Sequence, residues 1–391
     1  MSQHLSKPST EKVGAAIQLL ERANVLALKP FVEQGTQKPA QSIYYWAADQ
    51  LKGDPFSQEP FEVLSIAVGL AALTDKQTIQ EVCLYYFLQA IANPITANLA
   101  MESFRRYLHP NDVWAFEALT ELAGSKNDMA SQAVFGLGIL NNEKAVETLF
   151  KLARTNDKNV SHSAVVELAK RGDLRAVEIL ITKSKKRKWG DGELIHALGR
   201  LRTQDALPYL LELSQQFRAA KLSKYFHDED EEKSYTFDSL LYAFGQIGGD
   251  AALDEARQWF EHENQSLREQ AALALLDLGD TSGLGVLEAA APARLSEFQW
   301  QAGRCLLRNK YPRGLEHMIE HYQTALNILP SRKRGNSDRA NLIHSLRWDF
   351  DPSDLEFLNW VTQNDFDPTE QGWTLAEEAR RTIDFIQAKV K

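Results

Sequence analysis

The sequence AVFGLGILNNEKAVETL at residues 133–149 reappears as AVVELAKRGDLRAVEIL at residues 164–180. The two segments start 31 residues apart and share the pattern A-V-x-x-L, seven residues, A-V-E-x-L without a gap. Self-similarity at a fixed period is typical of repeat proteins, in which each supersecondary unit stacks on the next. The pattern therefore predicts a repeat architecture rather than a set of separate globular domains.

The same pattern extends over most of the chain when Leu137 is taken as position zero. Nine copies result, and their zero positions are Leu70, Phe104, Leu137, Leu168, Leu198, Phe244, Leu275, Leu306 and Leu346. Positions −4, 0 and +12 are apolar in all nine copies, although only 44% of the chain is apolar. Chance agreement at all of these positions is on the order of 10⁻¹⁰, so the repeat is real.

Each copy predicts two helices separated by a turn. Positions −4 and 0 lie one turn apart on one face of the first helix. Position +8 opens the second helix and is small in six copies, namely Ala145, Ala176, Ala206, Ala252, Gly283 and Gly314. Helix-stop and cap residues such as Gly172-Asp173 separate the two helices. No region alternates like a strand, so we expect an all-α, right-handed α-solenoid of about nine helix pairs with atypical capping ends.

The unit resembles the HEAT repeat, and more closely the short bacterial HEAT-like variety that also occurs in bilin lyases. The residues that carry the resemblance are Ala145-Val146 with Leu149, Leu198-Gly199, and Leu267-Arg268 with Ala271 and Leu275. The resemblance covers roughly residues 60 to 360 and implies an α-solenoid, a fold that hosts many functions. The arginine of the family pattern is matched only by Arg268 and Arg339, so an internal Arg–Asp ladder is not expected.

The spacing of the copies predicts three parts of the chain. Residues 1–60 form an N-terminal helical cap and degenerate repeat, 61–360 the solenoid, and 361–391 a C-terminal capping helix. Two long spacings place one insertion at about 217–237 and another at 330–335, both in turns between a second helix and the next first helix. In the capping helix, apolar residues stand at helical spacing, namely Leu375, Ala379, Ile383 and Ile386.

The first helix of a HEAT-like unit lines the concave surface of the solenoid. Because positions −4, −3 and 0 should be buried, positions −2 and −1 should face that surface. Position −2 carries aromatic, imidazole and guanidinium groups in several copies, namely Phe135, His196, Tyr242, Arg304 and His344. Such groups are enriched in binding hot spots, although they could equally be packing residues between neighbouring helices. We expect a non-catalytic scaffold that binds a protein or peptide partner on its concave surface.

Charged runs suggest a second surface, on one edge of the solenoid. The basic residues Lys185, Lys186, Arg187 and Lys188, and again Arg332, Lys333 and Arg334, could bind anions from outer-to-inner turns. The acidic run Asp228–Glu232 in the following copy would partly neutralise them. The net charge of −9 argues against a dedicated nucleic-acid binder. Nucleic-acid binding through the basic edge loops is therefore only an alternative to the scaffold. An accessory role similar to HEAT-like bilin lyases is a further alternative.

Catalytic motifs have little support. His317-Met318-Ile319-Glu320-His321 matches the zinc-peptidase pattern H-x-x-E-H, but Met318 is the +12 core residue and the histidines should flank the solvent side of their helix. The acidic segment 349–354 lacks the turn glycine and the final glutamate of a calcium loop. We assign no catalytic residue, metal or cofactor. The N-terminal residues lack an apolar signal segment and no run could span a bilayer, so we expect a cytoplasmic protein.

Overall fold

The structure is a computed structural model, in which part of the chain can be described. It describes residues 108, 110, 115–125, 130–220, 222, 231–290, 297–328, 332–348, 350–368 and 374–390. The predicted cap and degenerate repeat at 1–60 and the copy centred on Leu70 lie outside these residues, as do positions −4 and 0 of the copy centred on Phe104, whose position +12 is Phe116 at the start of α6. The described residues up to Glu167 belong to one compact unit, and those from Leu168 to Val390 form a second.

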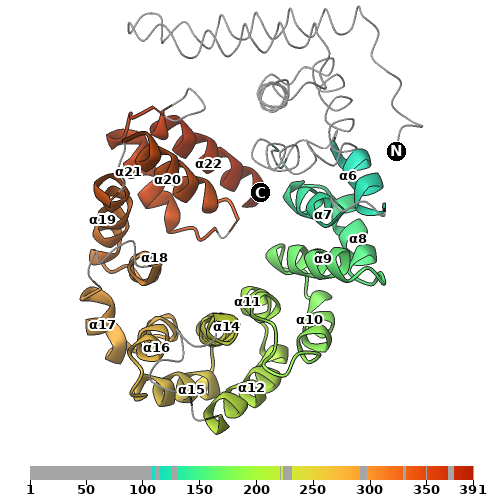
Figure 1. Ribbon diagram of the computed structural model, residues 1–391, viewed down its shortest axis with the longest axis horizontal. Helices are drawn as coiled ribbons and strands as arrows, with labels where there is room; N and C mark the ends of the chain where they lie inside the picture. Colours follow the sequence, from blue (N-terminus) through green and yellow to red (C-terminus); the bar gives the residue numbers. More distant parts are fainter. Residues whose placement is uncertain are drawn as a thin grey trace, which may run out of the picture. The chain divides into compact units, whose positions relative to one another are not determined.

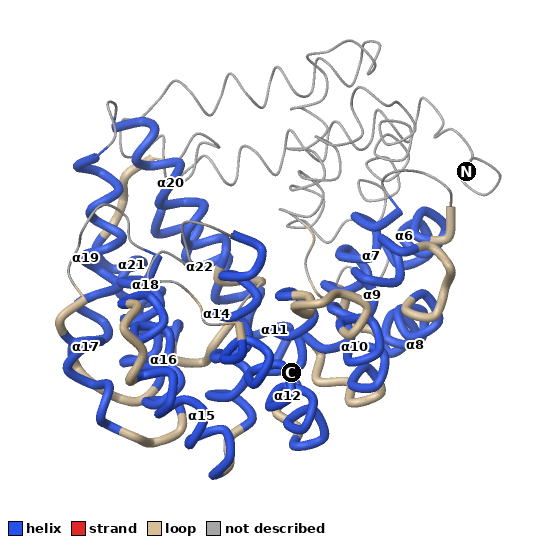
Figure 2. The backbone as a smooth tube through the Cα atoms, turned by 60° about the horizontal axis from the view of Figure 1, so that its bottom comes forward, coloured by secondary structure: helices blue, strands red, loops and turns tan. Residues whose placement is uncertain are grey.

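The described chain is all-α, which confirms the predicted α-solenoid (Figures 1 and 2). Helices of the first unit are α6 (Phe116–Ala123), α7 (Ala130–Ile139) and α8 (Glu143–Leu152), followed by α9 (Lys158–Lys170), in which the boundary between the units falls. The described ranges contain no strand, and their one isolated bridge joins Pro368 to Thr374. The elements alternate as the repeat predicts, one helix pair for each copy.

In the second unit the helices form two rows (Figure 1). The inner row consists of α11 (Gly192–Leu201), α14 (Glu231–Ile247), α16 (Gln265–Asp277), α18 (Glu297–Arg308) and α20 (Arg332–Ser345). The outer row consists of α10 (Ala176–Ser184), α12 (Leu207–Ala219), α15 (Asp250–Phe260), α17 (Leu284–Glu288), α19 (Arg313–Ile328) and α21 (Asp354–Asn364). The 3-10 turns η2 (Gln204–Ala206) and η3 (Thr281–Gly283) lead into α12 and α17, and α22 (Leu375–Val390) ends the unit.

The repeat pattern coincides with the hydrophobic core. Positions −4, 0 and +12 are described in seven copies, and all of them are buried except Leu342, which is half-buried. The six small residues predicted at position +8 are buried as well. A Cβ added to Gly314 would lie 2.3 Å from the backbone nitrogen of Leu307. Position +8 is therefore small because the second helix of a copy crosses the first at backbone contact.

The predicted insertion at 217–237 is not a simple loop. Helix α12 continues to Ala219 and α14 already begins at Glu231, so much of the inserted sequence lengthens the two helices. The extension is stabilised by an aromatic cluster, because Phe217 and Phe237 are fully buried and their ring centroids lie 5.6 Å apart. Trp189 packs on Phe217 and Trp259 on Phe237, at 5.2 and 4.7 Å. The extra turns thus carry core residues across neighbouring repeats.

The expected C-terminal helix is present as α22. Its residues Leu375, Ala379 and Ile386 are buried and Ile383 packs partly buried against the same core cluster. The helix contacts α20 and α21, so it covers the last helix pair of the second unit. This arrangement fits a cap, although the predicted domain boundaries themselves stay predictions.

Candidate functional site

The five residues predicted for the concave surface all lie on first helices of their copies and are all half-buried. Phe135 lies on α7 in the first unit. The other four lie on the inner row of the second unit, His196 on α11, Tyr242 on α14, Arg304 on α18 and His344 on α20. Four inner helices of the second unit therefore carry the predicted −2 side chains, and the surroundings of these side chains differ from helix to helix.

His196 and Tyr242 form one continuous aromatic surface. Their rings stack with centroids 4.1 Å apart and planes 7° from parallel. The stack forms because α11 and α14 approach at backbone distance: a Cβ on Gly199 would lie 2.7 Å from the Cα of Ala243. Two half-exposed faces held this rigidly offer contact area to a partner at little cost in side-chain entropy.

Arg304 is held by a buried carboxylate at the start of α21. Its Nε and Nη2 donate to the two oxygens of Asp354 at 2.9 and 2.7 Å, a bidentate arrangement. Asp354 is fully buried, and burial raises the pKa of this carboxyl although Arg304 and a backbone amide act against the rise. The guanidinium of Arg304 therefore has a fixed position at the surface, where 15% of the side chain is exposed.

His344 contacts the capping helix, and 15% of its side chain is exposed. Its Nδ1 lies 3.5 Å from Oε1 of Glu378 on α22, and its ring packs edge-on against Trp348. Nη2 of Arg347 donates to the same oxygen of Glu378 at 2.9 Å. Burial alone would raise the pKa of Glu378, but Arg347 and His344 outweigh it and lower the pKa to about 2. At this end of the row, a predicted binding residue also fastens the cap.

The prediction that position −1 also faces the concave surface is wrong. Among the described copies this position is buried in six, namely Gly136, Glu167, Ala197, Ala243, Ala274 and Cys305, and only Ser345 is exposed. The reason is a seam between neighbouring inner helices, in which a glycine at position +1 (Gly138, Gly199 or Gly245) faces residue −1 of the next copy. A Cβ on Gly245, for example, would lie 3.3 Å from the Cα of Ala274. Side chains at −1 fill the contact between copies.

The sequence interpretation missed position +2, which is the second column on the same surface. It holds polar or large side chains that are half-buried in six described copies, namely Lys170, Arg200, Gln246, Asp277, Arg308 and Trp348. The signal was available in the sequence, because residues four positions apart share one face of a helix. Adding +2 to −2 doubles the candidate surface.

Residues of this second column bind one another across repeats. Nε2 of Gln246 donates to Asp277 at 3.0 Å, and Nε and Nη2 of Arg308 donate to Asp277 at 3.1 and 2.6 Å. Nη1 of Arg308 also lies 3.6 Å from Asp351. An Arg–Asp ladder thus exists, which corrects the expectation of none. Of the two arginines at the family position, Arg268 bonds carbonyls of its own turn and Arg339 bonds Asp365 and Asp367, whereas the Arg308–Asp277 pair stands at +2.

The repeat geometry agrees with the comparison with known families. A family model described as HEAT repeats matches residues 116–189, which include α6 to α10. Residues 116–189 contain HEAT repeats. Their resemblance to the short bacterial variety is not tested by this match and stays a prediction. No curated protein matches the chain. HEAT repeats are commonly protein-interaction scaffolds.

The first basic run, Lys185–Lys188, lies in the turn after α10, as predicted. The turn is rigid, because the amide of Asp191 donates to the buried Ser184 hydroxyl at 3.0 Å. Two of its cations are paired, Lys185 with Glu212 at 3.4 Å and Arg187 with Glu232 at 2.5 Å. Glu232 belongs to the acidic run, so the predicted partial neutralisation occurs.

A pocket of about 420 Å³ lies beside this turn. It is lined by Arg187, Lys188, Trp189, Gly190, Glu232, Lys233 and Thr236. The ammonium groups of Lys188 and Lys233 lie 5.1 and 5.3 Å from the centroid of the Trp189 ring. The second basic run, Arg332–Arg334, is not in a turn as predicted but forms the first turn of α20. Lys233 of α14, which the sequence interpretation did not include, also lines this pocket, and anion binding at the basic turn stays a prediction.

The H-x-x-E-H pattern of α19 belongs to the packing between HEAT helices. His317 is fully buried and His321 is 7% exposed, so the expectation that they flank the solvent side is wrong. His317 lies against Gly303 of α18, and His321 packs on Trp300 with ring centroids 5.5 Å apart. Burial lowers the pKa of His321, which favours a neutral ring. Over the described ranges, no group of three or more His, Cys, Asp or Glu side chains could hold a metal ion.

Two further properties concern the described part of the chain. Each of its helices is too short or too polar to cross a lipid bilayer. The acidic segment before α21 uses its carboxylates internally, because Asp354 binds Arg304 and Asp351 accepts the backbone amide and hydroxyl of Ser353. These carboxylates connect repeats rather than form a loop open to an ion.

Proposed function

We propose that this chain is a non-catalytic HEAT-repeat scaffold that binds a protein or peptide partner on the inner row of helices. The binding surface would consist of the −2 and +2 columns of α11 to α20, with Phe135 as the equivalent residue on α7. The observation that supports the proposal best is the stacked pair His196–Tyr242, which is half-exposed and rigidly placed. Aromatic groups fixed in advance lose little entropy on binding and are typical anchors of interfaces.

The other predicted residues have supporting parts in this proposal. Arg304 would offer the exposed edge of a guanidinium whose position Asp354 fixes. His344 would contribute at the end of the row through its contact with Trp348. Because both also hold neighbouring helices together, their substitution would change folding and binding at the same time. His196 and Tyr242 are therefore the residues on which to test the surface.

The test is affinity purification from the native host with the wild-type chain and with His196→Ala/Tyr242→Ala. The matched control is Tyr235→Ala, because Tyr235 lies on the same helix as Tyr242 and is 53% exposed. We expect the double variant to lose the partner that the wild type and the control retain. Retention of every partner by a folded double variant would contradict the surface assignment.

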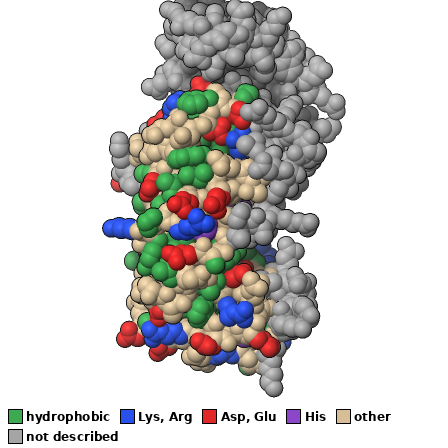
Figure 3. Space-filling view, turned by 90° about the vertical axis from the view of Figure 1, so that its left-hand side faces the viewer, with side chains coloured by type: hydrophobic (Ala, Val, Ile, Leu, Met, Phe, Trp, Pro, Cys, Tyr) green, Lys and Arg blue, Asp and Glu red, His purple; other side chains and the backbone are tan. Residues whose placement is uncertain are grey.

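Nucleic-acid binding through the basic edge is the weaker candidate. Lys185 and Arg187 of the basic edge pair with glutamates. On a different face, around α17 and α19, charges of both signs are interspersed (Figure 3). Phosphate contacts need cations that neutralise the nucleic-acid backbone, and here two of the cations already neutralise glutamates. A mobility shift at low salt that disappears with Lys186→Glu/Lys188→Glu would support this candidate, and no shift would remove it. No contact among the described residues favours a lyase-like role.

A further inference from the structure

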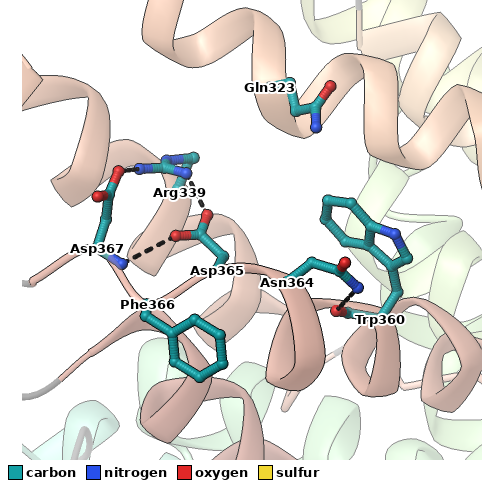
Figure 4. A pocket seen from close by; sticks show the side chains of 7 residues that line it. All are labelled: Gln323, Arg339, Trp360, Asn364, Asp365, Phe366 and Asp367. Carbon is teal, nitrogen blue, oxygen red and sulfur yellow. Dashed lines mark hydrogen bonds and ion pairs between the residues drawn. The ribbon is translucent and has the colours of Figure 1, made fainter.

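A second pocket lies between the outer helices α19 and α21 and the inner helix α20 (Figure 4). Its volume is about 520 Å³, and its lining residues are Gln323, Arg339, Trp360, Asn364, Asp365, Phe366 and Asp367. Neither column of the inner-row surface contributes to it. The pocket is therefore separate from the surface proposed above.

A charged cluster forms one side of the pocket. Arg339 is 3% exposed and donates to Asp365 through Nη1 and to Asp367 through Nη2, the latter at 2.8 Å. The hydroxyl of Tyr322 also donates to Asp365 at 3.0 Å, and burial raises the pKa of this hydroxyl, so it remains a donor. The lining carries two carboxylates and one guanidinium, and hence an excess negative charge.

The same cluster explains why a phenylalanine is exposed. Asp365 and Asp367 are fixed by Arg339, and the carbonyls of both accept amides from the start of α22 at 2.8 and 3.0 Å. Between them, Phe366 points away from the guanidinium (Figure 4) and is 61% exposed. Burial of a phenylalanine contributes about 2 kcal/mol or more, so this exposed ring offers apolar area to a bound ligand.

The remaining wall comes from α21 and α19. Trp360 and Asn364 are one helical turn apart, and the amide nitrogen of Asn364 donates to the carbonyl of Trp360 at 2.8 Å. This bond leaves the amide oxygen of Asn364 directed to the surface as an acceptor. Gln323 stands across the opening from Trp360 (Figure 4) and is exposed. Two aromatic rings and two carboxamides thus surround the charged cluster.

We propose that this pocket binds the arginine or lysine side chain of a peptide segment from a protein partner. Aromatic faces attract cations through the ring quadrupole, and the excess carboxylate selects positive over negative charge. The amides of Asn364 and Gln323 match the donors and acceptors of an extended peptide backbone. An arginine is favoured over a lysine, since its planar guanidinium stacks on a ring while it hydrogen-bonds at its edge.

Other classes of ligand fit this lining less well. An anion would meet two carboxylates, and its one natural partner, Arg339, is already bound by both. A purely apolar ligand would leave the two carboxamides and Asp367 without water. A basic peptide satisfies the charge, the rings and the amides together. The net charge of −9 on the whole chain also favours encounter with a basic segment.

The experiment measures binding of fluorescein-labelled Gly-Gly-X-Gly-Gly peptides, with X as Arg, Lys, Ala or Glu, by fluorescence anisotropy on the full chain. We expect the Arg peptide to bind most tightly, the Lys peptide less tightly, and the Ala and Glu peptides at least tenfold more weakly. Phe366→Ala should weaken the Arg peptide at least tenfold without lowering the melting temperature, because its ring is mostly exposed. Equal binding of the Arg and Ala peptides would overturn the proposal.

Two further variants make the result specific. Leu174→Ala removes a side chain that is equally exposed, at 60%, far along the chain from the pocket, and should leave Arg-peptide binding unchanged. Asp367→Asn should reduce the preference for Arg over Ala, whereas an unchanged preference would remove the charge argument. His196→Ala/Tyr242→Ala should not affect the Arg peptide, so failure of the inner-row surface and failure of this pocket are distinguishable.

Discussion

The seam between α11 and α14 and the seam between α20 and α22 join helices of one unit by opposite means. In the first, the backbones approach closely, because a Cβ added to Gly199 would lie 2.7 Å from the Cα of Ala243. In the second, Arg347 donates to Glu378 and to the hydroxyl of Thr382, and all three side chains are buried. One seam depends on shape and the other on charge.

The difference reflects the place of each seam in the array. A helix in the middle of the unit has a similar copy on both sides, so the same small residues can recur at +1 and −1. Helix α22 follows no repeat pattern, and Arg347, in the turn after α20, stands at position +1 where α11 and α14 carry glycine. Removing one partner of a buried ion pair leaves the other charge buried and uncompensated, so Arg347 and Glu378 hold the two segments in one position. The last helix pair is therefore joined to α22 by a specific ion pair rather than by close packing of small residues.

The largest expected effect is on the charged seam. Arg347→Met removes one partner of Glu378 and leaves a buried carboxylate, which should lower the free energy of unfolding by about 3–5 kcal/mol. The loss should appear as faster hydrogen exchange in α20 and α22. In the double variant Arg347→Met/Glu378→Leu most of the stability should return, since both charges are gone. Equal losses in the single and double variants would show that shape, not charge, holds this seam.

Acid should act on the same seam. The pKa of Glu378 is about 2 in the folded chain and 4.5 in its ordinary state, so its contribution is complete above pH 4.5 and disappears as the pH falls towards 2. The shift corresponds to about 3 kcal/mol. Asp354 acts in the opposite sense, because burial raises its pKa and protonation removes the cost of burying the charged carboxylate. Glu378→Gln should flatten the acid limb of a stability–pH profile, and an unaltered limb would contradict this assignment.

The stability of the seam between α11 and α14 should depend on side-chain volume. Gly199→Ala places a Cβ 2.7 Å from the Cα of Ala243, so the helices must separate at a cost of about 1–3 kcal/mol. Gly285→Ala is the matched control, because nothing lies within 4 Å of the added carbon. Urea unfolding at pH 7 and at low and high salt should show the same loss for Gly199→Ala. A loss that depends on salt would be inconsistent with a purely steric seam.

The smallest effect is expected at the exposed ion pair of the basic turn. Arg187 and Glu232 are 58% and 72% exposed, so water and salt screen their attraction. Arg187→Ala should change the free energy of unfolding by less than about 1 kcal/mol, as measured by urea denaturation. A loss as large as that of Arg347→Met would mean that burial does not distinguish the two kinds of ion pair.

The repeat pattern predicted the core well because apolar positions repeat in the sequence itself. Leu137, Leu168 and their equivalents are buried as expected. The seam was not predictable from one copy, since the role of Gly199 depends on Ala243 of the next copy. The ladder was missed for the same reason: Asp277 and Arg308 stand at matching positions in different repeats, and only their distance reveals the pair. His317 and His321 were misplaced because α19 packs with two faces rather than one.

The ladder along the inner row also sets how the second unit responds to force. Gln246, Asp277, Arg308 and Asp351 connect successive copies, and Arg200 donates to the carbonyl of Trp348, 148 positions further along the chain. Straightening the unit would stretch these links and bend the outer row little. These polar contacts should therefore add to the bending stiffness that the close packing at Gly199 and Gly245 provides. Because the Arg308 pairs are largely buried, salt should weaken their contribution only slightly.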